Sequence, residues 1–141
     1  MSTSAFRQRL VAVYDADTQV RAVTGRTTGS IKAWGRITHQ AYPVLSYYFV
    51  DVTDQTGIHG IRSVLLQVDA WGNADPERGD VTSISDLETL ISRAEALFTG
   101  EHLNQAGGLD CAVSPIRSGG DDPSNDGTTY RIRREFTIEL R

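Results

Sequence analysis

The segment TYRIRREFTIELR, residues 129–141, alternates apolar and polar side chains almost without interruption. Its apolar positions are Tyr130, Ile132, Phe136, Ile138 and Leu140. Arg131, Arg133, Glu135, Thr137 and Glu139 occupy the alternate positions. Because successive side chains of a strand point to opposite faces of a sheet, this segment predicts a strand with one buried and one solvated face.

Other segments predict further strands of the same sheet. Residues 43–51, PVLSYYFVD, are β-branched and aromatic and begin with a proline. Residues 61–71, IRSVLLQVDAW, alternate cleanly, and the glycine-containing loop before them predicts a hairpin. A weaker alternation over 109–113 predicts a fourth strand, and a short strand is expected within 31–37.

Two segments predict amphipathic helices. In residues 4–17, Phe6, Leu10, Val13 and Asp17 repeat at helical spacing, and Val11 and Tyr14 widen the stripe. In residues 82–98, apolar side chains step by three and four: Ile84, Leu87, Ile91, Ala94 and Phe98. Either Ser85 or Ser83 caps this second helix, since each has an acidic residue three positions later, and Gly100 is expected to stop it.

These elements predict one α+β two-layer domain over residues 1–141, joined by a long connection at 24–42 and a flexible loop at 118–127. We expect an antiparallel or mixed sheet of about four strands with two main helices on one face. Phe98 and Trp71 are expected on the core side.

Composition argues against several classes of function. The net charge of −4 argues against a basic nucleic-acid-binding surface, and the single cysteine, Cys111, excludes an internal disulfide and a cysteine-based zinc site. No apolar run is long enough to span a bilayer and no secretory signal opens the chain, which favours a soluble intracellular protein.

The segment VDVTDQTGIHGIR, residues 50–62, combines Asp51, Asp54 and His59 with two glycines. These residue types suit an active site, a metal clip or a polar hairpin tip. Metal and catalytic sites need several convergent groups, which the neighbouring sequence does not supply. Nucleophile-elbow, phosphate-binding-loop and calcium-loop patterns are also missing. We therefore expect no enzyme activity, no metal and no cofactor.

Charge is distributed unevenly along the chain. Four basic residues fall in a stretch without acids: Arg21, Arg26, Lys32 and Arg36, with Trp34 among them. A later stretch is acidic and includes Asp75, Glu77 and Asp80. Two interpretations remain open: two solvated loops of opposite sign, or complementary contact surfaces.

Several short motifs occur in a characteristic order. They are a first helix ending near Thr24-Gly25-Arg26, a strand led by Tyr42-Pro43-Val44, a strand ending Val68-Asp69-x-Trp71 before the long helix, and Asp122-Pro123 with Asp126-Gly127 before the last strand. In this order the chain resembles, over nearly its whole length, the tail-completion or tail-terminator proteins of long-tailed phages and gene transfer agents.

The resemblance implies a structural virion protein of the neck, made in the host cytoplasm. Such proteins form a ring, usually of six subunits, on the head-proximal end of the tail tube. The ring stops tube polymerisation and joins the tail to the head connector or stopper protein. DNA passes through its lumen without sequence-specific binding, and no membrane is involved.

The expected contacts with neighbouring subunits or the tube involve residues of three segments: Arg21, Arg26, Lys32, Trp34 and Arg36; Asp54, Gln55 and His59; and Asp75, Glu77 and Asp80. The alternatives are a head-closure or other head–tail adaptor protein, and a ligand-binding α+β module. A hydrolase without a recognisable motif is a third.

Overall fold

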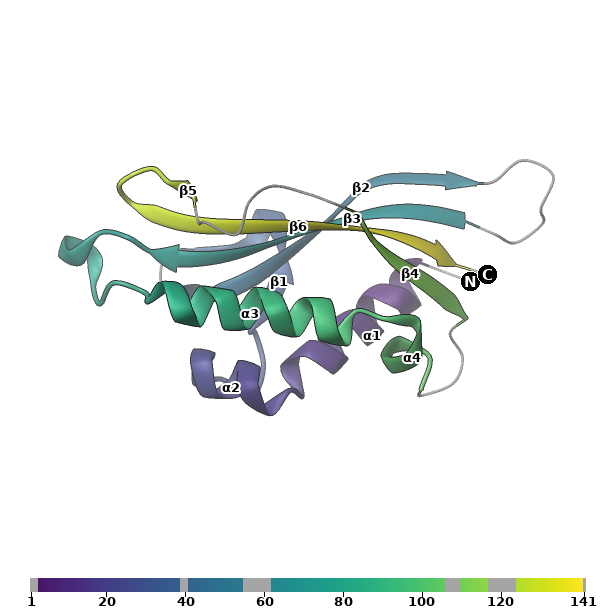
Figure 1. The fold of residues 1–141 in the computed structure, drawn as a ribbon, viewed down its shortest axis with the longest axis horizontal. Helices are drawn as coiled ribbons and strands as arrows, with labels where there is room; N and C mark the ends of the chain where they lie inside the picture. The colour runs from purple at the N-terminus through teal and green to yellow at the C-terminus, as the bar shows by residue number, and fades with distance from the viewer. Residues whose placement is uncertain (1–2, 39–40, 55–61, 106–109, 117–123, 141) are drawn as a thin grey trace.

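The computed structural model describes residues 3–38, 41–54, 62–105, 110–116 and 124–140 (Figure 1). The helices are α1 (Thr3–Asp15), α2 (Thr18–Thr24), η1 (Trp34–Arg36), η3 (Pro76–Arg78), α3 (Ile84–Leu97) and α4 (Gly100–Leu103), where η denotes a 3-10 helix. The strands are β1 (Ile31–Ala33), β2 (Val44–Asp54), β3 (Arg62–Asn73), β4 (Cys111–Ile116), β5 (Ser124–Asn125) and β6 (Thr129–Leu140).

The strands form one mixed sheet in the order β1-β2-β3-β6-β4, and β5 pairs with β6 outside this path. β1 runs parallel to β2, and the other pairings are antiparallel. The α+β class and the mixed sheet predicted from the sequence are confirmed. The expected count of about four strands was too low: β1 is the short strand expected within 31–37, and β5 is too short to produce a periodic pattern of its own.

The helices α1 to α4 cover one face of this sheet (Figure 1). Phe98 lies edge-on to Phe136 of β6, with ring centroids 6.1 Å apart, and Tyr14 of α1 packs against Phe98 at 5.7 Å. The Tyr14 hydroxyl donates a hydrogen bond to the carbonyl oxygen of Leu90 at 2.7 Å, which ties α1 to α3. Burial raises the pKa of Tyr14 well above its ordinary value, so the phenol keeps the proton it donates.

The amino-terminal helical region differs from the single helix expected over 4–17. α1 ends at Asp15, and Asp17 is the N-cap of α2, where its carboxylate accepts a hydrogen bond from the Val20 N–H. Arg93 of α3 also donates two hydrogen bonds to the Asp17 carboxylate, at 2.9 and 3.1 Å. Asp17 therefore starts a second helix instead of closing the first.

Glycine and arginine have separate roles after α2. Gly25 has a φ of 69°, a left-handed conformation that favours glycine, and its N–H bonds the Arg21 carbonyl to close the helix. The next residue, Arg26, directs its guanidinium inward. In the Thr24-Gly25-Arg26 motif, Gly25 therefore provides the backbone turn that ends α2, and Arg26 provides a side chain that turns back toward the protein.

The structure shows whether Ser83 or Ser85 caps α3, and where this helix ends. Ser83 accepts a hydrogen bond from the Asp86 N–H, so Ser83 and not Ser85 is the N-cap. Gly100 does not stop the helical region as expected: the chain bends after Leu97, and Thr99 caps the short helix α4.

The sheet face away from the helices carries a polar row. Asp69 pairs across the sheet with Ser46 and Arg133, and Arg133 Nε lies 2.9 Å from its carboxylate. Trp71 lies on this outer face, where its indole N–H donates to Ser46 and its ring stacks on Tyr42. The expectation that Trp71 faces the core was therefore wrong, because it follows the core residue Ala70 in the alternation.

Candidate interaction surface

The free edge of β2 forms a groove with unusual composition. β1 pairs with β2 only as far as Tyr47, whereas β2 continues to Asp54. In the described part of the chain, no other strand pairs with this side of β2. The groove has a volume of about 880 Å³; we call it the edge groove, and its lining is Arg7, Val11, Ile31, Lys32, Ala33, Trp34, Gly35, Arg36, Tyr47, Tyr48 and Phe49.

Large apolar side chains remain exposed at the edge groove. Trp34 is 55% and Tyr48 49% exposed, and their rings lie 6.0 Å apart. Val50, two residues after Tyr48 in β2, is also exposed, at an irregularity where the β2–β3 register shifts. Isolated exposed apolar residues are ordinary, but a contiguous aromatic patch is typical of an interaction site.

The charge of the edge groove has one sign. Its lining includes Arg7, Lys32 and Arg36, and none of its described lining residues is acidic. The Arg7 guanidinium lies over the Phe49 ring, 5.1 Å from the centroid, which leaves the cation at the groove surface. The groove therefore suits a partner that presents both apolar and negative groups.

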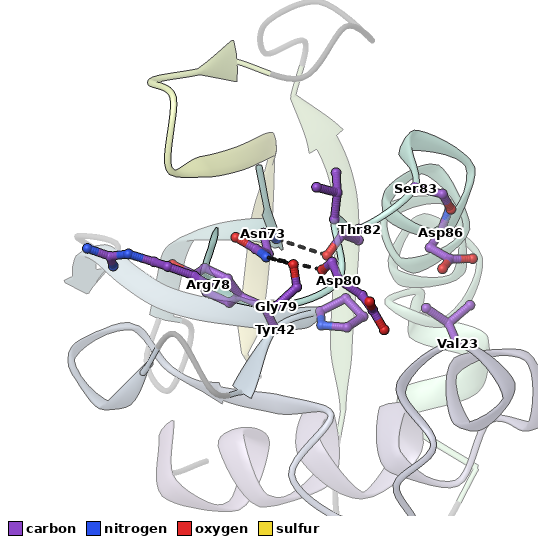
Figure 2. A pocket seen from close by; sticks show the side chains of 11 residues that line it. Val23, Tyr42, Asn73, Arg78, Gly79, Asp80, Thr82, Ser83 and Asp86 are labelled. Atoms are coloured by element: carbon purple, nitrogen blue, oxygen red, sulfur yellow. Dashed lines mark hydrogen bonds between the residues drawn. The ribbon is translucent and has the colours of Figure 1, made fainter. Parts of the chain in front are cut away.

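The acidic stretch after β3 forms a second surface, residues 75–84, which we call the acidic shoulder (Figure 2). Asp75 is the N-cap of η3 and accepts a hydrogen bond from the Glu77 N–H. The Asn73 side-chain amide donates to the carbonyl oxygens of Asp75, Gly79 and Asp80 at 2.9 to 3.2 Å. The buried Asn73 side chain therefore stabilises the backbone conformation of residues 75–80.

The acidic shoulder exposes both charged and apolar side chains. Glu77 and Asp80 are exposed, and so are Val81 (46%) and Ile84 (45%). Within the described residues, neither Glu77 nor Asp80 has an ion-pair partner, whereas Asp75 lies 3.7 Å from Arg78. A hollow of about 720 Å³ separates the shoulder from Tyr42, Pro43 and α2 (Figure 2).

The structure brings together only some of the basic residues expected at one contact surface. Lys32, Trp34 and Arg36 meet in the edge groove. Arg26 does not: its Nη2 donates to the carbonyl oxygens of Ala41 and Pro43, and burial lowers the pKa of its guanidinium. Arg21 is exposed, but its Nε donates to the Asp15 carbonyl oxygen at the α1–α2 junction.

The expected hairpin contacts fall largely outside the described residues. Asp54 ends β2, and its side chain lies outside the description, as do Gln55 and His59. The 118–127 loop is described only from Ser124 onward. There Asp126 accepts hydrogen bonds from the N–H groups of Thr128 and Thr129, which hold its pKa well below the usual range.

The described residues also include potential metal ligands and one cysteine. No three His, Cys, Asp or Glu side chains lie close enough together there to hold a metal ion. Cys111 is buried, with its thiol 3.3 Å from the Asn104 side-chain oxygen. None of the described helices has the length and apolar character needed to cross a membrane.

Sequence reasoning did not assign several residues to the two surfaces, among them Arg7, Tyr48, Val81 and Ile84. Tyr48 occupies a polar-face position of its strand, which is a signal the pattern does contain. Ile84 was assigned to the buried stripe of the second helix, but it lies at the first position of α3 and turns outward.

Comparison with known proteins finds solved structures of similar fold. No known protein family and no curated protein matches the sequence. A chain from the virion of a native gene transfer agent particle is 14% identical, with a TM-score of 0.61 over 97% of this chain and 92% of that one. Another solved structure is 18% identical, with a TM-score of 0.56 over 100% and 96%. At such identities the likeness is one of fold, and the protein shares the α+β fold of a gene transfer agent virion chain.

Proposed function

We propose that this protein is a structural component of a phage or gene transfer agent virion and acts in the neck. It forms a ring, of six copies, on the head-proximal end of the tail tube. The ring ends tube polymerisation and presents the next surface to the head connector or stopper protein. Genome DNA passes through its lumen without sequence-specific contacts.

The single observation that carries the proposal is the end-to-end likeness to a virion chain. The alignment covers 97% of this chain and 92% of the other, so the likeness of fold extends over nearly the whole of both chains. A fold alone does not specify a function. The order of motifs along this sequence independently resembles tail terminators, and the two lines of reasoning lead to the same class of particle.

The surface of the molecule supports an assembly role. The edge groove and the acidic shoulder are exposed, of opposite charge and separate from one another. A ring of identical subunits needs two different surfaces that fit each other, because its interfaces are heterologous. The edge groove and the acidic shoulder both contain exposed apolar side chains, which suit the water-excluded centre of an interface.

The test is native mass measurement combined with negative-stain imaging, for the protein alone and with tubes assembled from the tail-tube protein of the same particle. We expect a closed ring, seen either free or at one end of each tube. A monodisperse monomer at high concentration that never binds a tube end would contradict the proposal. Rings that bind the portal side of the head but no tube would indicate a head-closure or adaptor protein instead.

The hairpin loop after β2 is a proposed contact with the tube or with a neighbouring subunit. Asp54 at the end of β2 and the following Gln55 and His59 are polar, and hairpin loops commonly carry function while contributing little stability. Replacing all three with alanine should leave the melting temperature nearly unchanged and abolish tail completion. Normal tails from this variant, or a melting temperature lower by many degrees, would rule out that role.

A further inference from the structure

Among the described residues, the exposed rings and the cations of the edge groove are left without apolar cover and without a carboxylate. Trp34 and Tyr48 are about half exposed, and Lys32 and Arg36 have no carboxylate among the described residues that line the groove. Exposed tryptophan beside arginine is typical of the centre of a protein interface. An occupant must therefore bring apolar groups to cover the rings and carboxylates to meet the cations.

The acidic shoulder has the matching composition. Val81 and Ile84 supply exposed apolar side chains, and the exposed Glu77 and Asp80, which precede them in the sequence, supply negative charge. Its backbone is held by Asn73 and by the Thr82 hydroxyl, which accepts a hydrogen bond from the Asn73 N–H at 2.9 Å (Figure 2). A turn that is already ordered loses little conformational entropy when it docks.

We propose that the edge groove of one subunit receives the acidic shoulder of a second copy of this chain. The proposal deepens the ring assigned above and rests on it. Trp34 and Tyr48 pack on Val81 and Ile84 of the neighbour, while Lys32 and Arg36 face its Glu77 and Asp80. Arg26, engaged with backbone carbonyls, is not part of the contact.

The placement of the two surfaces gives the contact a direction. The groove lies on the free edge of β2, whereas the shoulder follows β3 and leads into α3, and the two share no lining residue. Each copy therefore offers one groove and one shoulder to two different neighbours. Repetition of such a head-to-tail contact closes a ring when the rotation per subunit divides the circle.

Charge reversal tests the pairing. The groove variant is Lys32→Glu with Arg36→Glu, and the shoulder variant is Glu77→Lys with Asp80→Lys. Each alone should weaken ring formation at least tenfold at low salt, because like charges then face each other across the contact. An equimolar mixture should restore rings, since each original surface finds an original partner and each reversed surface a reversed one.

Glu88→Lys with Glu101→Lys is the matched control. It changes the net charge as much as the shoulder variant does, but on exposed positions outside it. This control should assemble like the wild type. Far-ultraviolet circular dichroism and melting of each variant confirm that its fold is retained.

Chemical crosslinking tests the contact itself. One preparation carries Arg36→Cys and another Ile84→Cys, and a short bis-maleimide is added to the mixture. We expect crosslinked pairs that join one chain of each kind, well above pairs of either kind alone. The wild type, whose only cysteine is buried, gives the background.

The outcomes separate the contact from the ring. Rings that form normally in both reversal variants, with no 36–84 crosslink, overturn this contact and leave the proposed function standing. A wild-type protein that forms no ring, alone or on tubes, overturns the proposed function and this inference with it.

Discussion

Two aromatic clusters of this protein have opposite environments. The Phe98 ring lies 5.7 Å from Tyr14 and 6.1 Å from Phe136 between the helices and the sheet, and all three side chains are buried. Trp34 and Tyr48 lie 6.0 Å apart at the free edge of β2, and about half of each is exposed. Similar side chains thus serve folding in one place and remain available for association in the other.

The difference separates the residues that stabilise the fold from the residues that we propose for assembly. The covered face of the sheet meets its apolar partners within the chain, so its residues determine the free energy of unfolding. The edge groove is lined by arginine and lysine as well, which in the proposed contact face a negatively charged partner. Substitutions in the two clusters should therefore give separable effects.

The largest expected effect is on the buried cluster. Phe98 is 1% exposed and contacts both Tyr14 and Phe136, so Phe98→Ala leaves a cavity in the core. We expect a loss of about 3–5 kcal/mol in the free energy of unfolding, measured by urea denaturation. A loss below ~1 kcal/mol would mean that this cluster does not support the fold.

A smaller loss is expected from Arg26, which resembles the groove cations in sequence but not in position. Arg26→Ala leaves the carbonyl oxygens of Ala41 and Pro43 without their donor, at a cost of about 1–3 kcal/mol. The matched variant Arg36→Ala removes an exposed cation and should change stability by less than ~0.5 kcal/mol. Equal losses in the two variants would contradict the distinction between them.

The Asp17–Arg93 pair adds a stability term that depends on pH. Burial opposes ionisation of Asp17, but the hydrogen bonds from Arg93 and the α2 backbone outweigh it, so its pKa lies below the ordinary value. Stability from this pair is full above the unfolded-state pKa of about 4 and is lost as the pH falls through the lower folded-state value.

Asp17→Asn isolates that term, because asparagine still caps α2 but carries no charge for Arg93. We expect the variant to be less stable than the wild type at pH 7, with the difference shrinking below about pH 4. Urea denaturation over this pH range measures it, and Asp80→Asn, at an exposed position, is the control. A difference that stays constant down to pH 2 would exclude an ionic role for Asp17.

The smallest effect on folding is expected at the exposed cluster. Trp34→Ala removes a side chain that is more than half exposed, so the free energy of unfolding should change by less than ~0.5 kcal/mol. Ring formation, followed by sedimentation, should nevertheless be lost, because the apolar centre of the contact is gone. A large drop in monomer stability would place Trp34 with the core instead.

The sequence predicted the elements whose periodicity is long. α3, β3 and β6 are each twelve or more residues long, and their patterns identify the element type and most of the buried face. The exceptions, Trp71 and Ile84, lie near the ends of their elements. α2 was missed because its N-cap, Asp17, has the same spacing as the stripe of α1. Its partner Arg93 is 76 residues away, and nothing local reveals that contact.

The candidate site was predictable only in part, for a related reason. Trp34 stood out as an aromatic residue among the basic residues of the long connection, and the acidic stretch was apparent from composition. That Arg36 lines a groove while Arg26 turns inward depends on the parallel pairing of β1 with β2 and on the path of 41–43. Arg7 reaches the groove only because α1 packs beside Phe49. Such placements are set by tertiary contacts, which no local pattern contains.

The length of tail tubes assembled with and without this protein tests the proposed role most directly. Tube protein of the same particle is allowed to polymerise, wild-type protein is added part-way, and lengths are measured by negative-stain microscopy. We predict that growth stops at the length reached on addition and that each arrested tube carries a ring at one end. The Trp34→Ala variant should let growth continue. Tubes that keep lengthening in the presence of excess wild-type protein would contradict the role of a tail terminator.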